Sequence, residues 1–399
     1  MRKTSALRGA LQVTVTVSTL LVGRCATAAP MHYNLSELPL MFGAFGSTAT
    51  GINDSSAVTG YQTTSSFSSD AYTAKGNTLA DVNALSTQFG SFPQNSLGYA
   101  INNSGTIVGS EDASGSTTAF VLNAGASAVT EIGTLPGMQY SEALGINDNG
   151  VVVGDSSGFT NSGFTMHAFV YANGTMTDLN AAIAAGNAGA VESKANGINS
   201  NGDVTGYWQD SAGVQHAFVY NLASSTLTTL PTLLPSASSP NSTGTAINAN
   251  GVVVGSADAV TGSTGAIQHA FTYNNGVTTD LGALGSASNF SSALAINSAG
   301  IIVGTSSDNI GNLNAFVVQG GTMYNLNNLV NSLNGWQLQG ATGINSQGDI
   351  VGYGIDPNST PAAFILTPDA PPAVPEAPSS MALCLLSAVG FVAFKPRRS

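Results

Sequence analysis

The feature that most constrains the fold is a short phrase that occurs seven times: a small residue, Ile, Asn, a turn, a β-branched run and Gly. The Asn residues of this phrase are separated by 49, 45, 52, 49, 49 and 48 residues. A nearly fixed period of this length is typical of repeat architectures, in which each unit needs its neighbours to bury its apolar faces. The seven residues are Asn53, Asn102, Asn147, Asn199, Asn248, Asn297 and Asn345.

The Asn of each copy predicts a tight hairpin. In six copies Gly follows three residues later, and only Ser56 departs from this rule, while another Gly comes four residues further on in all seven. Asn tolerates turn geometry, and Gly adopts the positive φ that closes a short turn. We therefore expect two antiparallel strands at the start of every copy.

A third and a fourth strand are predicted after each hairpin. Ala precedes an aromatic residue in every copy, and three copies read His-Ala-Phe, at 167–169, 216–218 and 269–271. A short element such as 176–179 follows. Four short strands every ~49 residues predict one blade of a propeller. The expected fold is an all-β, seven-bladed β-propeller over residues 29–367, and a linear β-solenoid is the alternative.

The two ends of the repeat array complement each other. The seventh copy stops at 364–366 without a fourth strand, whereas residues 31–35 have no preceding three and closely match the fourth element at 323–326. We expect the N-terminal strand to complete the last blade, because this removes an exposed sheet edge. A solenoid would not need such complementary ends.

The repeats, with three intact His-Ala-Phe motifs, resemble the HAF-repeat family of extracellular proteins. The resemblance covers nearly all of residues 31–367. It implies export and a repeat β fold, but it brings no settled activity to this chain.

The first 28 residues have the order of a secretory signal peptide. Arg2, Lys3 and Arg8 precede an apolar stretch over 11–22, and small residues lead to Ala28. This order predicts cleavage after Ala28 and a mature chain that begins at residue 29.

The other end predicts a sorting signal. A Pro-rich linker over 368–380 contains Pro375 and Glu376, and residues 381–399 are a short hydrophobic helix and a basic tail with Arg397 and Arg398. The apolar run 381–394 spans about 21 Å as a helix, short of the ~30 Å hydrocarbon core, so we expect a transient membrane tether only. The whole segment resembles the PEP-CTERM signal of Gram-negative bacteria. That resemblance implies export and processing by an exosortase.

The charge of the repeat region excludes two classes of partner. Between residues 31 and 372 only Lys75 and Lys194 stand against 20 carboxylates, a formal charge of −18. Such a surface repels phosphate backbones and anionic headgroups, so no nucleic acid is expected. A neutral, polar or cationic partner fits the charge.

The predicted binding face carries the long connections between the second and third strands and between blades, because loops carry binding groups while repeats carry packing. Trp208 and Trp336 are candidates for stacking on a sugar ring, with packing as the alternative role. Glu142 and Glu192, together with Lys194, would form a reactive set if they converged at one end of the channel.

Six of the seven copies place carboxylates near the start of the connection between the second and third strands. They could collect Ca²⁺, with Asp112, Asp258 and Asp308 as the metal candidates, or they could form a solvated rim. No other cofactor is expected. The three repeated His residues lie on different blades, so we expect structural hydrogen bonds from them. The carboxylates are Glu111, Asp112, Asp155, Asp210, Asp258, Asp308 and Asp356.

These observations predict an exported surface or extracellular-matrix binding module, with exopolysaccharide as its partner. The alternative is a secreted propeller enzyme that acts on glycans as a lyase or hydrolase. No residue is assigned a catalytic role, because fold alone does not license an activity.

Overall fold

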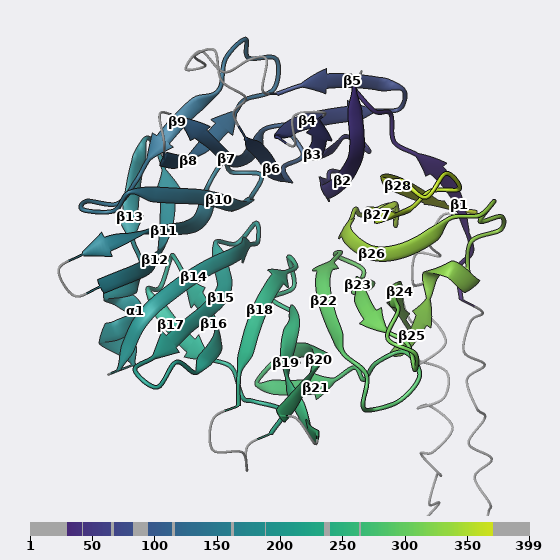
Figure 1. Cartoon of the computed structure of the whole chain (residues 1–399). Helices are drawn as coiled ribbons and strands as arrows, with labels where there is room; N and C mark the ends of the chain where they lie inside the picture. The colour runs from purple at the N-terminus through teal and green to yellow at the C-terminus, as the bar shows by residue number, and fades with distance from the viewer. Residues whose placement is uncertain are drawn as a thin grey trace, which may run out of the picture.

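A computed structural model of the chain confirms the predicted fold. Seven four-stranded antiparallel sheets stand as blades around a central axis (Figure 1). The predicted signal peptide, most of the Pro-rich linker and the hydrophobic tail lie outside the described residues. The structure describes residues 30–369 except 42, 65–67, 83–94, 114–115, 161–162, 188, 235–239 and 263–264.

The first three blades follow one another along the chain, and their strands run outward from the axis in sequence order. Blade 1 contains β2 (Ala44–Ile52), β3 (Val58–Thr64), β4 (Ser69–Lys75) and β5 (Thr78–Asp81). Blade 2 contains β6 (Ser96–Ile101), β7 (Ile107–Ala113), β8 (Ser116–Leu122) and β9 (Thr130–Gly133). Blade 3 contains β10 (Tyr140–Ile146), β11 (Val152–Thr160), β12 (Gly163–Ala172) and β13 (Thr175–Asp178).

The next three blades keep the same order. Blade 4 contains β14 (Ala190–Ile198), β15 (Asp203–Asp210), β16 (Gln215–Asn221) and β17 (Thr226–Thr229). Blade 5 contains β18 (Ser242–Ile247), β19 (Val253–Gly262), β20 (Gly265–Asn274) and β21 (Val277–Asp280). Blade 6 contains β22 (Ser291–Ile296), β23 (Ile302–Ser307), β24 (Leu313–Gln319) and β25 (Thr322–Asn325).

Blade 7 is built from both ends of the chain, as predicted. Its inner strands are β26 (Gln337–Ile344), β27 (Ile350–Ile355) and β28 (Pro361–Pro368), and its outermost strand is β1 (Tyr33–Glu37). Strand β1 pairs antiparallel with β28, with Tyr33 opposite Pro368. The Tyr33 side chain is fully buried, and Gln319 of blade 6 donates to its hydroxyl at 2.9 Å. The N-terminal strand therefore closes the ring.

In the described parts of the connections between blades lie two short helices. Helix α1 (Asn180–Gly186) joins blades 3 and 4 and buries Ile183 against the core between them. The 3₁₀ helix η2 (Leu326–Asn328) leads from blade 6 toward blade 7. Among the described residues no helix has the length and apolar character needed to span a bilayer.

A glycine and an aromatic residue form the core of each blade. Gly154 of β11 lies opposite Phe169 of β12, and a Cβ on Gly154 would lie 1.8 Å from the carbonyl oxygen of Glu142. Only Gly lets the first two strands approach this closely. The seven aromatic side chains are at most 1% exposed, and their burial supplies much of the apolar core. They are Tyr72, Phe120, Phe169, Phe218, Phe271, Phe316 and Phe364.

A serine on the innermost strand fastens each of six blades to the preceding blade. Ser141 of blade 3 accepts a hydrogen bond at 2.9 Å from the backbone N–H of Ala119 in blade 2. Ala119 is fully buried at this contact, so the residue at this position must be small. The six acceptors are Ser47, Ser96, Ser141, Ser193, Ser242 and Ser291.

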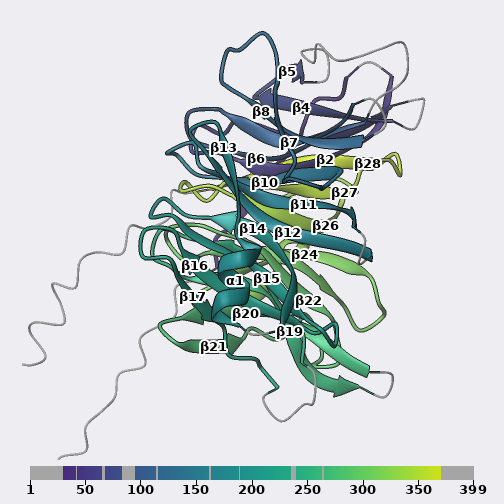
Figure 2. The same cartoon turned by 90° about the vertical axis from the view of Figure 1, so that its left-hand side faces the viewer.

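The ring has two different faces, seen edge-on in Figure 2. The turn face carries the Asn-containing hairpins and the turns between third and fourth strands. The loop face carries the connections between second and third strands and between blades. Because β1 begins and β28 ends on the turn face, both described ends of the chain lie there, side by side. Asp369 donates its N–H to the carbonyl of His32 at 3.0 Å.

Candidate functional site

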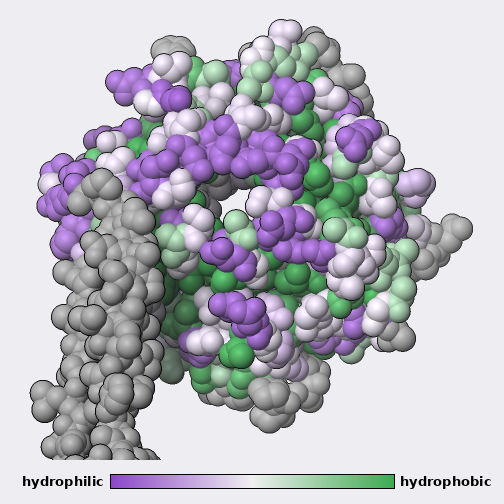
Figure 3. All heavy atoms as spheres, turned by 180° about the vertical axis from the view of Figure 1, so that it is seen from behind, coloured by the Kyte–Doolittle hydropathy of each residue, from purple (hydrophilic) through white to green (hydrophobic). Residues whose placement is uncertain are grey.

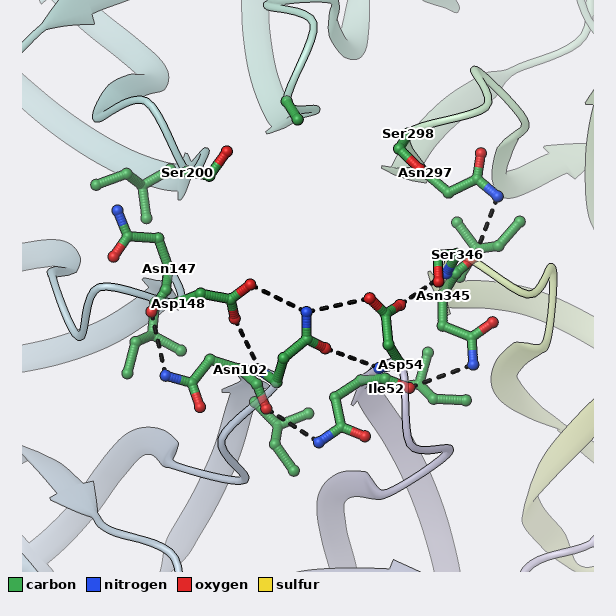
Figure 4. Close-up of a pocket in the computed structure, with 17 residues that line it drawn as sticks. Ile52, Asp54, Asn102, Asn147, Asp148, Ser200, Asn297, Ser298, Asn345 and Ser346 are labelled. Carbon is green, nitrogen blue, oxygen red and sulfur yellow. Dashed lines mark hydrogen bonds between the residues drawn. The ribbon is translucent and has the colours of Figure 1, made fainter.

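A closed circle of side-chain amides surrounds the axis at the turn face. The Nδ2 atom of each repeated Asn donates to the backbone carbonyl of the repeated Asn in the next blade, over 3.0 to 3.2 Å. The seven side chains are between 3% and 5% exposed. Figure 4 shows part of this set around the opening, including the bonds from Asn102 to Asn147 and from Asn297 to Asn345 as dashed lines. We call this set the Asn circle.

The same side chains also hold their own hairpins. Oδ1 of Asn147 accepts the N–H groups of Asn149 and Val151 at 3.1 and 3.0 Å. Asn is the residue that can accept within its turn and donate to the next blade at once. The sequence predicted the role of Asn in its own hairpin and missed its hydrogen bond to the next blade. The constant spacing of Asn was the signal for both.

A polar depression of about 320 Å³ lies over the Asn circle. The residue after each repeated Asn lines it, and these residues differ around the ring: Asp54, Asn103 and Asp148 on blades 1 to 3 face Ser and Ala on the others. Asn103 donates to both Asp54 and Asp148, at 3.1 and 3.0 Å. Figure 3 shows the turn face with hydrophilic residues around the central opening. The carboxylates of Asp54 and Asp148 are thus already hydrogen-bonded to Asn103.

A second cavity, of about 490 Å³, lies deeper in the channel on the loop side of the Asn circle. A β-bulge at the same position in every innermost strand supplies its lining. A bulge re-aims a side chain, and here it aims one residue per blade into the channel. The seven bulged residues are Thr50, Tyr99, Leu144, Asn196, Thr245, Leu294 and Thr342.

The cavity wall mixes hydroxyl, amide and apolar groups. Leu144, Leu294 and the ring of Tyr99 are its apolar parts, and Thr243, Ser256 and Ser292 add hydroxyls beside the bulged residues. Thr50 and Thr342 each donate to a carbonyl of the neighbouring blade at 2.7 Å. The wall therefore offers both flat apolar surface and hydrogen-bonding groups.

Charged residues from two blades form a cluster that includes Lys194 of the cavity wall. The Nζ atom of Lys194 on β14 lies 2.9 Å from Asp155 Oδ1 and 3.4 Å from Glu142 Oε2. Glu142 and Asp155 are cross-strand neighbours on β10 and β11. The Tyr99 hydroxyl donates to Glu142 Oε1 at 3.3 Å. The convergence of Glu142 and Lys194 that the sequence left open is therefore present, with Asp155 as a member that it missed.

Burial and mutual attraction set the charges of this cluster. Burial raises the pKa of the Asp155 carboxyl, and this effect exceeds the opposing effect of Lys194. For Lys194, burial acts to lower the pKa, but Asp155 and Glu142 more than offset it, so that the pKa lies above its ordinary value. Burial and the charge of Glu142 raise the pKa of Tyr99. Lys194 is thus a cation at neutral pH, and Tyr99 is a neutral hydroxyl.

Glu192 lies two residues before Lys194 on the same strand, at the edge of the cluster. Its Oε2 accepts from Gln209 Nε2 at 3.4 Å. Burial raises the pKa of Tyr207; Lys194 acts to lower that pKa, whereas Asp155 and Glu192 act to raise it. Glu192 has no ion pair with Lys194 among the described contacts, so it stands apart from the converged set.

The two tryptophans, candidates for stacking on a sugar ring or for packing, are both buried. Trp208 lies within β15 and is 8% exposed, and Trp336, directly before β26, is 7% exposed. Trp208 stacks on His216 at 4.2 Å between ring centroids and donates to Thr229 at 3.2 Å. Position 208 lies inside the sheet because the second strand continues past Gly206 to Asp210. On the loop face, Phe159 and Phe164 are the exposed aromatic pair, 70% and 52% exposed.

The carboxylates at the start of the long connections mostly bind local backbone or side-chain groups. Asp210 Oδ1 accepts the N–H groups of Ala212 and Val214, which lowers the pKa of Asp210. Asp308 caps its turn in the same way, through Ile310 and Asn312.

Two further members fasten the connections between blades. Asp258 accepts from the backbone N–H of Asn241 at 2.9 Å, and Asp112 accepts from Asn95 at 3.0 Å. In the part of the chain that the structure describes, no group of three His, Cys, Asp or Glu side chains could hold a metal ion.

The repeated histidines lie on separate blades and contact aspartates of their own blades. His167 Nδ1 lies 2.9 Å from Asp178, and His216 Nε2 lies 3.1 Å from Asp210. His269 is nearly fully buried and contacts Asp280 at 3.0 Å. Sorting residues Pro375, Glu376, Arg397 and Arg398, and the cleavage position Ala28, lie outside the described residues.

Comparison with known proteins gives one family match. A family model described as "Protein of unknown function (DUF3466)" matches residues 136–361, which is more than half of the chain. No curated protein matches the chain.

Several solved structures are similar in fold. A puromycin-hydrolyzing peptidase from Mycobacterium tuberculosis aligns with a TM-score of 0.53 and 9% identity, covering 85% of this chain and 55% of that chain. YCF48 from Cyanidioschyzon merolae aligns with a TM-score of 0.46 and 11% identity, covering 84% of this chain and 98% of that chain. The chain thus spans about half the length of the peptidase, and at these identities the likeness concerns the fold alone.

Proposed function

The chain belongs to the DUF3466 family of proteins of unknown function, and from that premise we propose that it is an exported binding module whose channel takes a segment of polysaccharide. The observation that carries the proposal is the cavity of about 490 Å³ on the loop side of the Asn circle. Its size is within the range of small-molecule sites. A sugar unit presents apolar C–H faces and polar edges, and the wall offers Leu and Tyr surfaces beside Thr, Ser and Asn groups.

The charge of the ring supports this choice of ligand. Two lysines against 20 carboxylates between residues 31 and 372 disfavour polyanions at long range. Inside the channel, Lys194 is already paired with Asp155. A saccharide without carboxylates or phosphates meets no such repulsion.

The positions of the chain ends support attachment to a cell envelope. Both described ends lie on the turn face, where Tyr33 pairs with Pro368. A tether that continues from residue 369 would hold the turn face toward the membrane. The loop face, through which the deeper cavity opens, would then point outward toward extracellular matrix.

Binding is tested with a glycan array and residues 29–372. We expect Leu294→Trp to fill the cavity and weaken binding at least about tenfold. Val277→Trp is the matched control, because Val277 is 63% exposed on an outermost strand. Unchanged melting of both variants shows that folding is intact. An array without any bound glycan contradicts the proposed function.

Export is tested separately by intact mass. We propose that the secreted form begins at residue 29 and lacks residues 381–399, after processing by an exosortase-type enzyme. A species outside the cell that retains Arg397 and Arg398 contradicts this processing.

The second candidate is a secreted enzyme acting on glycans, and the convergence of Glu142, Asp155 and Lys194 favours it. Its carboxylates, however, are neighbours on one sheet and share one lysine. A glycosidase places two carboxyl groups on either side of the bond that breaks. Incubation of bound glycans with the protein, followed by mass analysis of the products, separates the two: shortened chains show an enzyme, and intact chains support binding.

A further inference from the structure

We propose that Glu142 is an ammonium-binding residue and that the channel takes a saccharide with a free amino group. This inference rests on the proposed function and specifies its ligand. The charges and contacts of Glu142 with Lys194 and Tyr99 identify the binding position.

The charges of the cluster do not balance. Lys194 lies closer to Asp155, at 2.9 Å, than to Glu142, at 3.4 Å. Asp155 is also the buried partner, with 5% of its side chain exposed, so it depends more on the lysine. Lys194 and Asp155 neutralise each other, and Glu142 remains as the excess negative charge beside Lys194 and Tyr99, which line the cavity.

Glu142 has capacity to accept a further hydrogen bond. Its contacts with Tyr99 and Lys194 are 3.3 and 3.4 Å long. Charge-assisted hydrogen bonds are usually 2.7 to 2.9 Å. One third of its side chain is exposed. A carboxylate has about four acceptor positions, so Glu142 can accept a shorter bond from an ammonium donor.

Few cations of the repeat region could compete with a ligand ammonium for Glu142. Lys75 is the other lysine between residues 31 and 372, and it lies exposed on β4, the third strand from the axis. A ligand ammonium would therefore meet a carboxylate and no neighbouring unpaired cation. A uronate would bring a like charge to Glu142, which disfavours acidic saccharides.

Three oligosaccharides of equal length test the proposal by calorimetry with residues 29–372: a glucosamine oligomer, its N-acetylated form and an oligouronate. We expect the glucosamine oligomer to bind at least about tenfold more tightly than the acetylated form. We also expect this preference to decrease with added salt, because an exposed charge interaction is screened.

Glu142→Gln tests the residue itself, since it removes the charge and keeps the shape. The variant should lose the preference for the amine and keep its affinity for the acetylated oligomer. Lys194 and Asp155 remain a neutral pair in this variant, so folding should persist, and the melting temperature checks it. Glu131→Gln, an exposed site on the outermost strand β9, is the control for a change in overall charge.

The outcomes separate this inference from the proposed function. Equal affinity for the amine and acetyl forms, or a preference for the uronate, overturns the ammonium site and leaves saccharide binding in place. No affinity for any saccharide overturns both. An amine preference that survives in Glu142→Gln assigns the preference to another residue and overturns the role of Glu142.

Discussion

Asn345 donates its side-chain N–H to the backbone carbonyl of Asn53, 292 residues earlier in the chain, over 3.2 Å. This bond joins the last blade to the first at the axis, and the pairing of β1 with β28 joins the chain ends at the rim. The ring is therefore closed both next to the axis and at the outer rim. The two closures can be tested independently.

Asn147→Ala should destabilise the ring by about 2–3 kcal/mol, because it removes a buried donor to Asn199 and the acceptor that holds its own hairpin. Chemical denaturation measures the loss. Asn149→Ala is the matched control: the side chain of this exposed neighbour donates to the Ser200 carbonyl, and its removal should cost at most about 0.5 kcal/mol. Equal costs for the two variants would show that the Asn circle adds nothing to stability.

Gly154→Ala should cost about 3 kcal/mol or more, because its Cβ would collide with the carbonyl of Glu142. Gly51→Ala is the control. A Cβ there meets Ala100 at an ordinary 3.4 Å, and the equivalent position is already Ala in blade 2. Unfolding curves of both variants test the expectation, and a well-folded Gly154→Ala would refute the close approach of β10 and β11.

Deletion of residues 31–38 should expose the edge of β28 and cause aggregation or loss of the melting transition. Tyr33→Phe serves as the milder variant. It keeps the buried ring and removes only the hydroxyl that binds Gln319, so it should elute as the wild type does. Monomeric elution and unchanged melting of the deletion would argue against closure by β1.

Lys194→Met should cost about 2–4 kcal/mol at pH 7, since Asp155 and Glu142 lose their cation. Burial raises the pKa of Asp155, so the native variant binds more protons than its unfolded state and gains stability as the pH falls toward 5. In the wild type the raised pKa of Lys194 keeps the ion pair through neutral pH, and its contribution is lost only as pH rises through that pKa. Lys75→Met, at an exposed site, should show neither effect.

Chelator followed by millimolar Ca²⁺ should leave the melting temperature unchanged. Asp258 and Asp308 belong to different blades and each accepts hydrogen bonds from amide groups beside it, so they do not form one ligand set. A metal specific to the native state would raise the melting temperature. A rise on addition of Ca²⁺ would therefore restore the metal hypothesis for these carboxylates.

The period of the sequence was enough to predict the blade, the number of blades and the closing strand. It could not place Glu142, because register depends on a bulge. Counting back from the Asn147 hairpin pairs Ile146 with Val152, and without the bulge Glu142 would face Ser156. The bulge shifts the pairing by one and sets Glu142 opposite Asp155. A shift of one residue moves a side chain to the other face of a sheet, and here it decides whether the carboxylates meet.

Contacts between blades were also beyond the sequence pattern. Ser141 and its equivalents stand six residues before the repeated Asn in six copies, but their partners lie on the preceding blade. A repeat shows what each unit contains, and it does not show how far neighbouring units rotate against each other. The burial of Trp208 could not be predicted from the repeat either, because it depends on stacking with His216 and on the length of β15.

The place of β28 between β27 and β1 has a mechanical consequence. A force applied at Pro368 and opposed at the loop face pulls β28 along its own length. Two hydrogen-bond ladders then resist in shear, so their bonds must stretch together before any of them breaks. A force that separates Tyr33 from Pro368 instead opens one ladder from its end, bond by bond. A ring held only at its C-terminal end would therefore withstand drag that would peel it apart if it were held by both ends.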